Sequence, residues 1–225
     1  MRGRLFKEAE TIFIIDERSP PHHGIGYGAR HDPALAWGYA LRSVEASIQT
    51  DEPLWLHLLK TMTQEKHLAI CTNTTDMSME RVFGDEVPIL ETHGSIEFMQ
   101  CNTNCSNELW TPHSVDMDMT VDGETGRAER TPKCRNPECT SGARFNILLQ
   151  GDTHFCDRKR RIQRDMWRIF IDNQAGKDAI LVVELCKKTN EKTLELVRHL
   201  GANYIQIKEE DCELTQIHQE WLQIK

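Results

Sequence analysis

Apolar runs and helical stripes alternate along the chain. The continuous β-branched run at residues 11–15 is typical of a buried strand. Asp32 followed by Pro33 predicts the start of a helix, because the first can cap it and the second is pre-set for its first turn. The predicted apolar face of this helix consists of Trp37, Leu41, Val44 and Ile48. A second helix is predicted after residues 51–53, and its apolar stripe consists of Leu54, Leu58 and Leu59.

The same alternation continues to the C-terminus. Further strands are predicted at residues 67–71, 87–90, 145–149, 179–184 and 204–207. A helix is predicted at 191–200, stopped by Gly201. Another is predicted within residues 156–175, with its core-facing side formed by Ile162, Met166, Ile169 and Phe170. Helices that alternate with apolar strands predict an α/β protein with a Rossmann-like parallel sheet and helices on both faces.

Charge excludes several partners. The 225 residues include 27 Lys and Arg against 35 Asp and Glu, a formal net charge of −8. Because this balance lacks a basic field, we expect no nucleic-acid partner, and we interpret the basic run at 158–161 as a solvated helix face. No apolar run approaches the roughly 20 residues that cross a bilayer, and residues 1–8 do not resemble a secretory signal. The sequence therefore predicts an intracellular, cytoplasmic protein with no membrane partner.

Four of the eight cysteines form two close pairs. Cys101 and Cys105 are separated by a short polar turn, and Cys134 and Cys139 by a turn that contains Asn136 and Pro137. Reduced cysteines in such pairs are better interpreted as metal ligands than as disulfides. Four thiolates form a closed tetrahedral shell for zinc, with no open position for catalysis. We therefore predict a structural zinc site in a small module inserted at residues 101–140.

Polar segments follow three of the predicted strands. These segments are residues 72–76 (Thr-Asn-Thr-Thr-Asp), 91–95 (Glu-Thr-His-Gly-Ser) and 150–152 (Gln-Gly-Asp). In this order, with the two cysteine pairs, they resemble the loops of the sirtuin family, the NAD-dependent protein deacylases. Residues 144–152 match the family's Arg-Pro-(Asp/Asn) to Gly-(Glu/Asp) motif without a gap. Residues 32–42 and 93–101 are especially similar to a sirtuin-like branch widespread in bacteria.

The resemblance spans roughly residues 9–208 and implies specific roles. NAD would bind the Rossmann-like part, and acyl-lysine of a protein or peptide would enter beside the zinc module. His93 matches the loop histidine that acts as general base toward a ribose hydroxyl. Asn73 and Asp76 match the nicotinamide pocket, although the same alignment allows Thr74 in place of Asn73.

Ile147 and Leu148 match the wall of the family's acyl-lysine channel, and an ordinary buried strand accounts for them equally well. The implied domain boundaries are a sirtuin-like domain at 9–208, with Rossmann-like parts at 9–100 and 141–208 around the 101–140 module. Residues 209–225 form a C-terminal tail whose apolar spacing predicts packing on its own domain.

Two phosphate-facing loops depart from the family pattern. Sirtuins have Gly-Ala-Gly after the first strand, where residues 16–21 here are Asp-Glu-Arg-Ser-Pro-Pro. Residues 16–20 also match the family's later Asp-Phe-Arg segment, in which case the glycine loop is absent. The glycines at 24–28 follow no strand directly and are a weak phosphate loop. Residues 185–188 (Leu-Cys-Lys-Lys) replace a Gly-x-Gly segment.

Three functions are consistent with this sequence. The first is NAD-dependent removal of acyl groups from protein lysine, with transfer to ADP-ribose. The second is another NAD-consuming activity, hydrolysis or ADP-ribosyl transfer. The third is a catalytically silent binding or scaffold protein on a sirtuin frame. His93 and Asp76 favour the first two, whereas the altered glycine loops favour the third.

Overall fold

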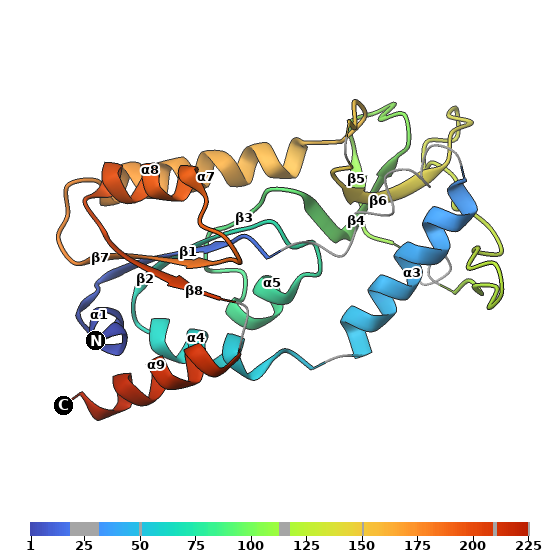
Figure 1. The fold of residues 1–225 in the computed structure, drawn as a ribbon. Coiled ribbons are helices and arrows are strands. Elements are labelled where there is room, and N and C mark those ends of the chain that lie inside the picture. Colours follow the sequence, from blue (N-terminus) through green and yellow to red (C-terminus); the bar gives the residue numbers. More distant parts are fainter. Residues whose placement is uncertain (19–31, 50, 113–117, 150, 209–210, 225) are drawn as a thin grey trace.

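A computed structural model describes residues 1–18, 32–49, 51–112, 118–149, 151–208 and 211–224, and shows two lobes (Figure 1). The larger lobe is built on a five-stranded sheet in which every pair of neighbouring strands is parallel. Its strands in spatial order are β3 (Ile89–Glu91), β2 (His67–Thr72), β1 (Thr11–Asp16), β7 (Ile180–Leu185) and β8 (Asn203–Ile207). The predicted α/β class with a parallel sheet is therefore confirmed.

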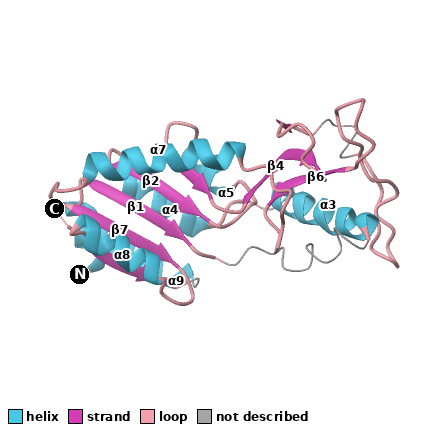
Figure 2. Cartoon of the chain, turned by 90° about the horizontal axis from the view of Figure 1, so that it is seen from above, coloured by secondary structure: helices cyan, strands magenta, loops and turns pink. Residues whose placement is uncertain are grey.

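Helices cover both faces of this sheet (Figure 2). Because side chains alternate along a strand, Ile12 and Ile14 of β1 enter one core while Phe13 and Ile15 enter the other. The first core packs against α1 (Arg2–Glu8), α4 (Leu54–Thr63), α5 (Ser78–Phe83) and α9 (Asp211–Gln223). The second packs against α7 (Arg158–Gln174) and α8 (Glu191–Leu200). The carboxyl ends of the strands point toward the smaller lobe, where ligands of such sheets bind (Figure 1).

The smaller lobe combines a second sheet with one long helix. The sheet is antiparallel and contains β4 (Gly94–Cys101), β5 (Leu109–Trp110) and β6 (Ala143–Ile147). Helix α3 (Pro33–Gln49) packs on it through Trp37, whose ring lies 5.0 Å from that of Phe145 and whose Nε1 donates to the Ala143 carbonyl. The strand predicted at 145–149 thus exists as β6, but it pairs with β4 outside the parallel sheet. Apolar alternation predicts a strand without specifying its neighbour.

Two predicted helix faces are only partly correct. On α4 the predicted Leu59 is buried together with Leu56, Met62 and Thr63, while Leu54 is 67% exposed. On α7 the predicted core residues Ile162, Met166 and Ile169 are exposed, and Trp167 and Gln174 are buried instead. Of that predicted face, only Phe170 packs against the sheet core. Both helices carry apolar side chains on more than one face, so periodicity alone does not identify the side that meets the sheet.

The C-terminal segment packs on its own lobe, as predicted. Leu214 and Ile217 of α9 are buried in the core that also contains Phe6 of α1 and Leu56 of α4. Within the part of the chain that the structure describes, no helix is both long and apolar enough to span a bilayer.

Candidate functional site

The four paired cysteines converge in the smaller lobe. Their sulfur atoms all lie within 4.8 Å of one another. The Sγ atoms of Cys101 and Cys139 are 3.8 Å apart, and those of Cys105 and Cys134 are 3.7 Å apart. Cys101 ends β4, and a turn closed by the bond from the Asn104 amide to the Cys101 carbonyl leads the chain to Cys105. The second cysteine pair, Cys134 and Cys139, is closed by a similar turn.

This donor set fits zinc. The four sulfur atoms lie close together and come from the two cysteine pairs. They form the closed shell that a tetrahedral structural zinc ion takes. Burial acts against ionisation, yet hydrogen bonds from Thr103 and from the Cys105 backbone lower the pKa of the Cys101 thiol to about 6. Burial raises the pKa of the Cys134 thiol to about 12, so zinc, which binds the thiolate, would displace a proton there. The cluster therefore supports the predicted zinc module.

The loops after β2 and β3 are joined at the carboxyl edge of the parallel sheet. The Thr92 amide and hydroxyl both donate to the Thr72 carbonyl, at 2.9 and 3.1 Å. The Ile96 amide donates to the Thr75 carbonyl at 3.0 Å. Next to the pairing of β4 with β6, the Leu148 amide donates to the His93 carbonyl at 2.8 Å. These bonds place half-buried His93 between the polar loop of β2 and the end of β6.

Gly94 makes this placement possible. Its φ is +78°, and a Cβ built on it would lie 2.0 Å from the Asn146 carbonyl oxygen. Only glycine combines that backbone conformation with such a close approach to β6. The His-Gly pair of the sequence thus has a steric reason in the structure.

The hydrogen bonds of Thr92 define the tautomer of His93. Thr92 Oγ1 lies 3.0 Å from His93 Nδ1. The single hydroxyl proton of Thr92 is already donated to the Thr72 carbonyl, so Oγ1 can only accept from the ring. With the hydroxyl in this orientation, a neutral ring would carry its proton on Nδ1 and offer Nε2 as an acceptor. Sequence reasoning did not identify Thr92 as a partner of His93, although their adjacency was visible.

Asn73 and Asp76 lie in the loop after β2, as the sequence predicted. Asn73 Nδ2 donates to Glu17 at 3.3 Å, whereas its buried Oδ1 accepts no hydrogen bond in the structure. Asp76 Oδ1 accepts from the Ser78 amide at 3.0 Å and so holds the start of α5. Thr74, the alternative to Asn73, is buried and exchanges a hydrogen bond with Thr72 over 2.9 Å. Asn73 thus has an unused acceptor, while Thr74 serves the loop itself.

A groove between α3 and the larger lobe runs beside Asp76. Three arginines line it: Arg18, Arg42 and Arg81. Arg18 also lies over the ring of Trp55, 4.6 Å from its centroid, and Arg81 pairs with Glu52 at 2.5 Å. The groove therefore combines three arginines with three carboxylates, those of Asp51, Glu52 and Asp76, at the boundary of the lobes.

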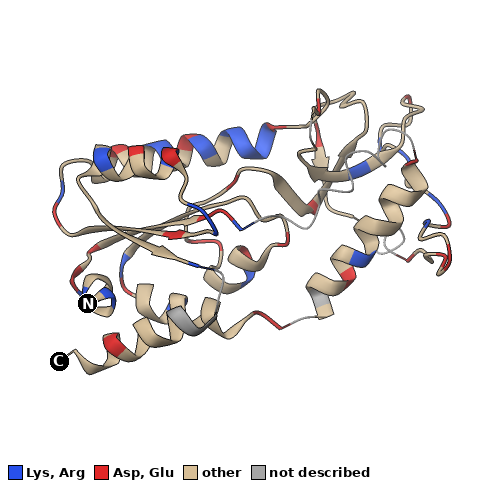
Figure 3. Cartoon of the chain, viewed as in Figure 1, with Lys and Arg blue, Asp and Glu red and all other residues tan. Residues whose placement is uncertain are grey.

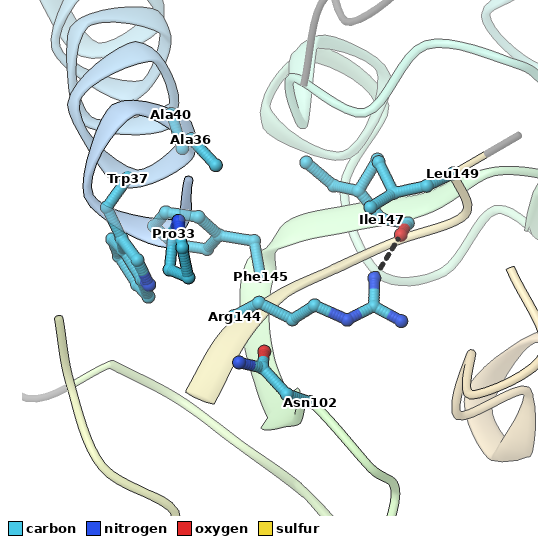
Figure 4. Close-up of a pocket in the computed structure, with 9 residues that line it drawn as sticks. All are labelled: Pro33, Ala36, Trp37, Ala40, Asn102, Arg144, Phe145, Ile147 and Leu149. Atoms are coloured by element: carbon cyan, nitrogen blue, oxygen red, sulfur yellow. Dashed lines mark hydrogen bonds between the residues drawn. The ribbon is translucent and has the colours of Figure 1, made fainter. Parts of the chain in front are cut away.

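A second, apolar cavity lies between α3 and β6 (Figure 4). Its lining is Pro33, Ala36, Trp37, Ala40, Asn102, Arg144, Phe145, Ile147 and Leu149. Arg144 closes one side by donating to the Ile147 carbonyl at 2.9 Å and to Asp152 at 2.5 Å. Of the two residues predicted to line an acyl-lysine channel, Ile147 lines this cavity, and Leu148 is absent from its lining.

Carboxylates occupy the carboxyl edge between β1 and β7. Buried Asp16 forms two hydrogen bonds of 2.8 Å with the Arg18 guanidinium and accepts a third from Thr72. Glu184 is fully buried and accepts from the Asn190 amide and from the Tyr204 hydroxyl. Burial raises the pKa of Glu17, which lies beside both. This half of the edge does not fit a diphosphate.

Arg18 lies two residues from Asp16, whereas Thr72 and Tyr204 come from distant parts of the chain and were not predicted as partners of these carboxylates. Residues 19–21, the glycine-rich segment 24–28 and Gln150 lie outside the described residues, so their predicted roles stay predictions.

Comparisons with known proteins identify the fold of the chain but no family at the level of sequence. No family profile and no curated protein sequence matches the chain. A Sir2 homologue in complex with 2′-O-acetyl ADP ribose superposes with a TM-score of 0.66 at 12% identity, covering 98% of this chain and 95% of that one. A Sir2–p53 peptide–NAD+ complex gives 0.65 at 16%, covering 96% and 94%. A Sir2 protein bound to a propionylated peptide gives 0.65 at 15%, covering 96% and 95%.

These matches extend over nearly the whole of each chain, so both lobes and their connection are shared. The resemblance predicted from the loops and cysteines is confirmed at the level of structure. The chain has the fold of the Sir2 sirtuins.

Proposed function

We propose that the protein is an NAD-dependent deacylase that removes acyl groups from protein lysine. The observation that carries this proposal is His93, positioned at the boundary of the lobes with its Nδ1 3.0 Å from the Thr92 hydroxyl. Neighbours with this fold were solved with NAD+ and with a propionylated peptide, which supports the same pair of ligands here.

His93 would act as the general base. Nδ1 is held by Thr92, so the imidazole accepts a proton at Nε2 without turning. The proton would come from a ribose hydroxyl of the bound nucleotide. An imidazole titrates close to neutral pH, so this transfer needs no large shift of its pKa. Thr92 is a positioning residue in this scheme, because it acts through the ring.

The described residues fit the nicotinamide end of NAD. Asn73 Oδ1 is a buried acceptor without a hydrogen bond, which matches the amide donor of a carboxamide. Asp76 lines the adjacent groove. Bound NAD supplies the ribose carbon from which nicotinamide leaves when the acyl oxygen attacks. Positive charge for its phosphates would come from Arg42 in the groove, since the Arg18 guanidinium is paired with Asp16 and the β1–β7 edge is acidic.

The acyl-lysine would enter between the lobes. The cavity between α3 and β6 is lined mainly by apolar side chains, as an acyl chain requires, and Ile147 belongs to its wall. The four cysteines would hold zinc and stabilise β4 and the following loops, with no part in the chemistry. The proposed partners are therefore acylated proteins or peptides.

Nicotinamide release from NAD, with and without an acyl-lysine peptide, tests the proposal. We expect release that depends on the peptide and falls about 10²–10⁴-fold in His93→Ala. Thr92→Val should lower the rate and alter its pH profile, while Thr92→Ser, which keeps the hydroxyl, should restore both. Release that does not need the peptide would point instead to an NAD hydrolase or ADP-ribosyltransferase. Absence of release would contradict every NAD-consuming scheme.

A second candidate function is a silent binding or scaffold protein. The carboxylates Asp16, Glu17 and Glu184 favour it, because they gather where a diphosphate is expected. Calorimetric titration of the folded, zinc-loaded protein with NAD separates the two candidates. Binding supports the deacylase, whereas no heat at millimolar NAD supports the scaffold.

A further inference from the structure

Helix α7 carries an apolar stripe that is largely exposed among the residues that the structure describes. Ile162, Met166 and Ile169 are 58%, 50% and 61% exposed. Their spacing of four and three residues aligns them on one side of the helix. The opposite side holds Trp167, which packs against Phe13 of the sheet. The helix therefore has a core face and a separate outward apolar face.

A row of alternating charges runs beside this stripe. Arg161, Asp165 and Arg168 each precede one residue of the stripe, and Asp172 continues the same spacing, so the four form a second line parallel to it. All four are exposed. Within the described part of the chain, Asp165, Arg168 and Asp172 make no ion pair, while Arg161 pairs with Asp157 at 3.1 Å. Basic residues dominate the first turns of this helix (Figure 3).

The order of signs makes the row self-complementary. Read from the N-terminus it is plus, minus, plus, minus. A second copy of the same helix, laid antiparallel, presents minus, plus, minus, plus. Asp165 of each copy then faces Arg168 of the other, and Arg161 faces Asp172, around a two-fold axis close to Met166. In a parallel two-fold pair the row would lie on opposite flanks of the interface in the two copies, so these opposite-charge contacts would not form.

We infer that α7 is the interface of an antiparallel, two-fold homodimer, in which the two apolar stripes cover each other. An interface of this kind uses the same patch on both copies, which is the property that the sequence of charges provides. The helix lies on the outer side of the larger lobe, over the same face of the sheet as α8 (Figures 1 and 2). The carboxyl edge of the sheet and His93 lie outside this interface, so the inference does not depend on the proposed deacylase activity.

The expected dimer is weak. A helix of 17 residues is about 26 Å long, and one pair of such helices buries less than a standard interface of about 1,600 Å². We therefore expect a dissociation constant of about 10–100 µM. Sedimentation velocity of the full chain over a range of concentrations measures it directly. A chain that stays monomeric at about 500 µM overturns the inference.

Charge reversals at the central pair give the decisive test. Asp165→Arg places two arginine pairs across the axis, and Arg168→Asp places two aspartate pairs. Each variant alone should raise the dissociation constant about tenfold or more. An equimolar mixture of the two should dimerise again, because every cross-chain contact then joins opposite charges. The double variant, with both changes in one chain, should also dimerise.

Two further measurements exclude other occupants and nonspecific effects. Met166→Lys should abolish the dimer, whereas Leu54→Lys, at an equally exposed apolar position on α4, should not. Dimers that persist in Met166→Lys, or single reversals that no mixture rescues, contradict an antiparallel α7 pair. Binding of the wild-type chain to anionic lipid vesicles, lost in Met166→Lys, would assign the stripe to a membrane surface instead and overturn the inference.

Discussion

The two lobes hold their cores together by different means. The larger lobe buries apolar side chains on both faces of a parallel sheet, and five of the six residues of β1 are buried apolar or β-branched side chains with at most 6% exposure. The smaller lobe has a three-stranded sheet, and two of its cysteines, Cys101 and Cys134, belong to its core. Its long connections between β5 and β6 have few strand pairings of their own.

This difference indicates that the two lobes are stabilised by different interactions. The larger lobe can be stable through burial alone, because it encloses two apolar layers. The smaller lobe has too little core for its loops and relies on α3 and on the cysteine cluster. The proposed active site lies where the two lobes meet, so a change in either lobe should affect it. Loss of zinc and loss of apolar burial can be measured separately.

The largest expected effect is loss of zinc, which should destabilise the smaller lobe and leave the larger lobe unchanged. Cys134→Ser should reduce bound zinc from about one ion per chain to near zero, because a structural site needs all four ligands. The free energy lost to the small lobe is of order 10 kcal/mol. Hydrogen exchange should then show lost protection in β4 and β6 and retained protection in β1 and β7. Cys156→Ser, at a buried cysteine outside the cluster, should keep both zinc and protection. Unchanged zinc in Cys134→Ser would contradict the cluster as a metal site.

The next effect is confined to the larger lobe. Leu59→Ala on α4 should lower the free energy of unfolding by about 2–5 kcal/mol, because Leu59 is fully buried. Leu54→Ala, on the same helix but exposed, should change it by less than about 0.5 kcal/mol. Urea unfolding followed by circular dichroism measures both, and the zinc content should be unchanged. Equal losses in the two variants would show that the observed face of α4 is wrong.

A smaller effect tests how α3 contacts the cysteine-bearing loops. A Cβ on Gly38 of α3 would lie 2.0 Å from the Gly126 carbonyl oxygen, so Gly38→Ala must push the helix away from that turn. Overpacking of this kind costs about 1–3 kcal/mol. Gly123→Ala, in the same loop but with open space around it, is the matched control. Thermal unfolding should show a lower midpoint for Gly38→Ala alone.

Sequence reasoning predicted elements better than their partners. The strand at 11–15 and the helix after Asp32 were predicted because each has a clear local signal, continuous apolar β-branching or a cap with proline. The cysteine pairs were recognised because metal-ligand spacing is also local. The faces of α4 and α7 were only partly correct, since Ile162 and Trp167 are both apolar and only the sheet decides which one it buries.

The same limit applies to the candidate site. His93 was identified by its loop, but its tautomer depends on the Thr72 carbonyl, which lies on another strand. The acidity of residues 16–17 was visible in the sequence. The hydrogen bonds that stabilise these buried carboxylates were not visible in the sequence, because Asp16 pairs with Thr72 and Glu184 pairs with Tyr204 through tertiary contacts. Residue order predicts the kind of site, and packing decides the protonation and charge within it.

The smallest expected effect is a pH dependence that belongs to the larger lobe. Burial, and then the negative charge of Glu91, raise the pKa of Glu80 from 4.5 to about 8. The folded protein therefore binds more protons than the unfolded chain between these values, and the free energy of unfolding falls as pH rises from about 4.5 to about 8. Glu80→Gln removes this titration and should raise stability at pH 9 by about 1 kcal/mol relative to the wild type. Urea unfolding at pH 5 and pH 9 measures the difference, and Glu86→Gln, at an exposed neighbour on the same connection, should leave the wild-type slope intact. A slope that survives in Glu80→Gln would assign the pH dependence to another group and leave the two lobes alike in their response to pH.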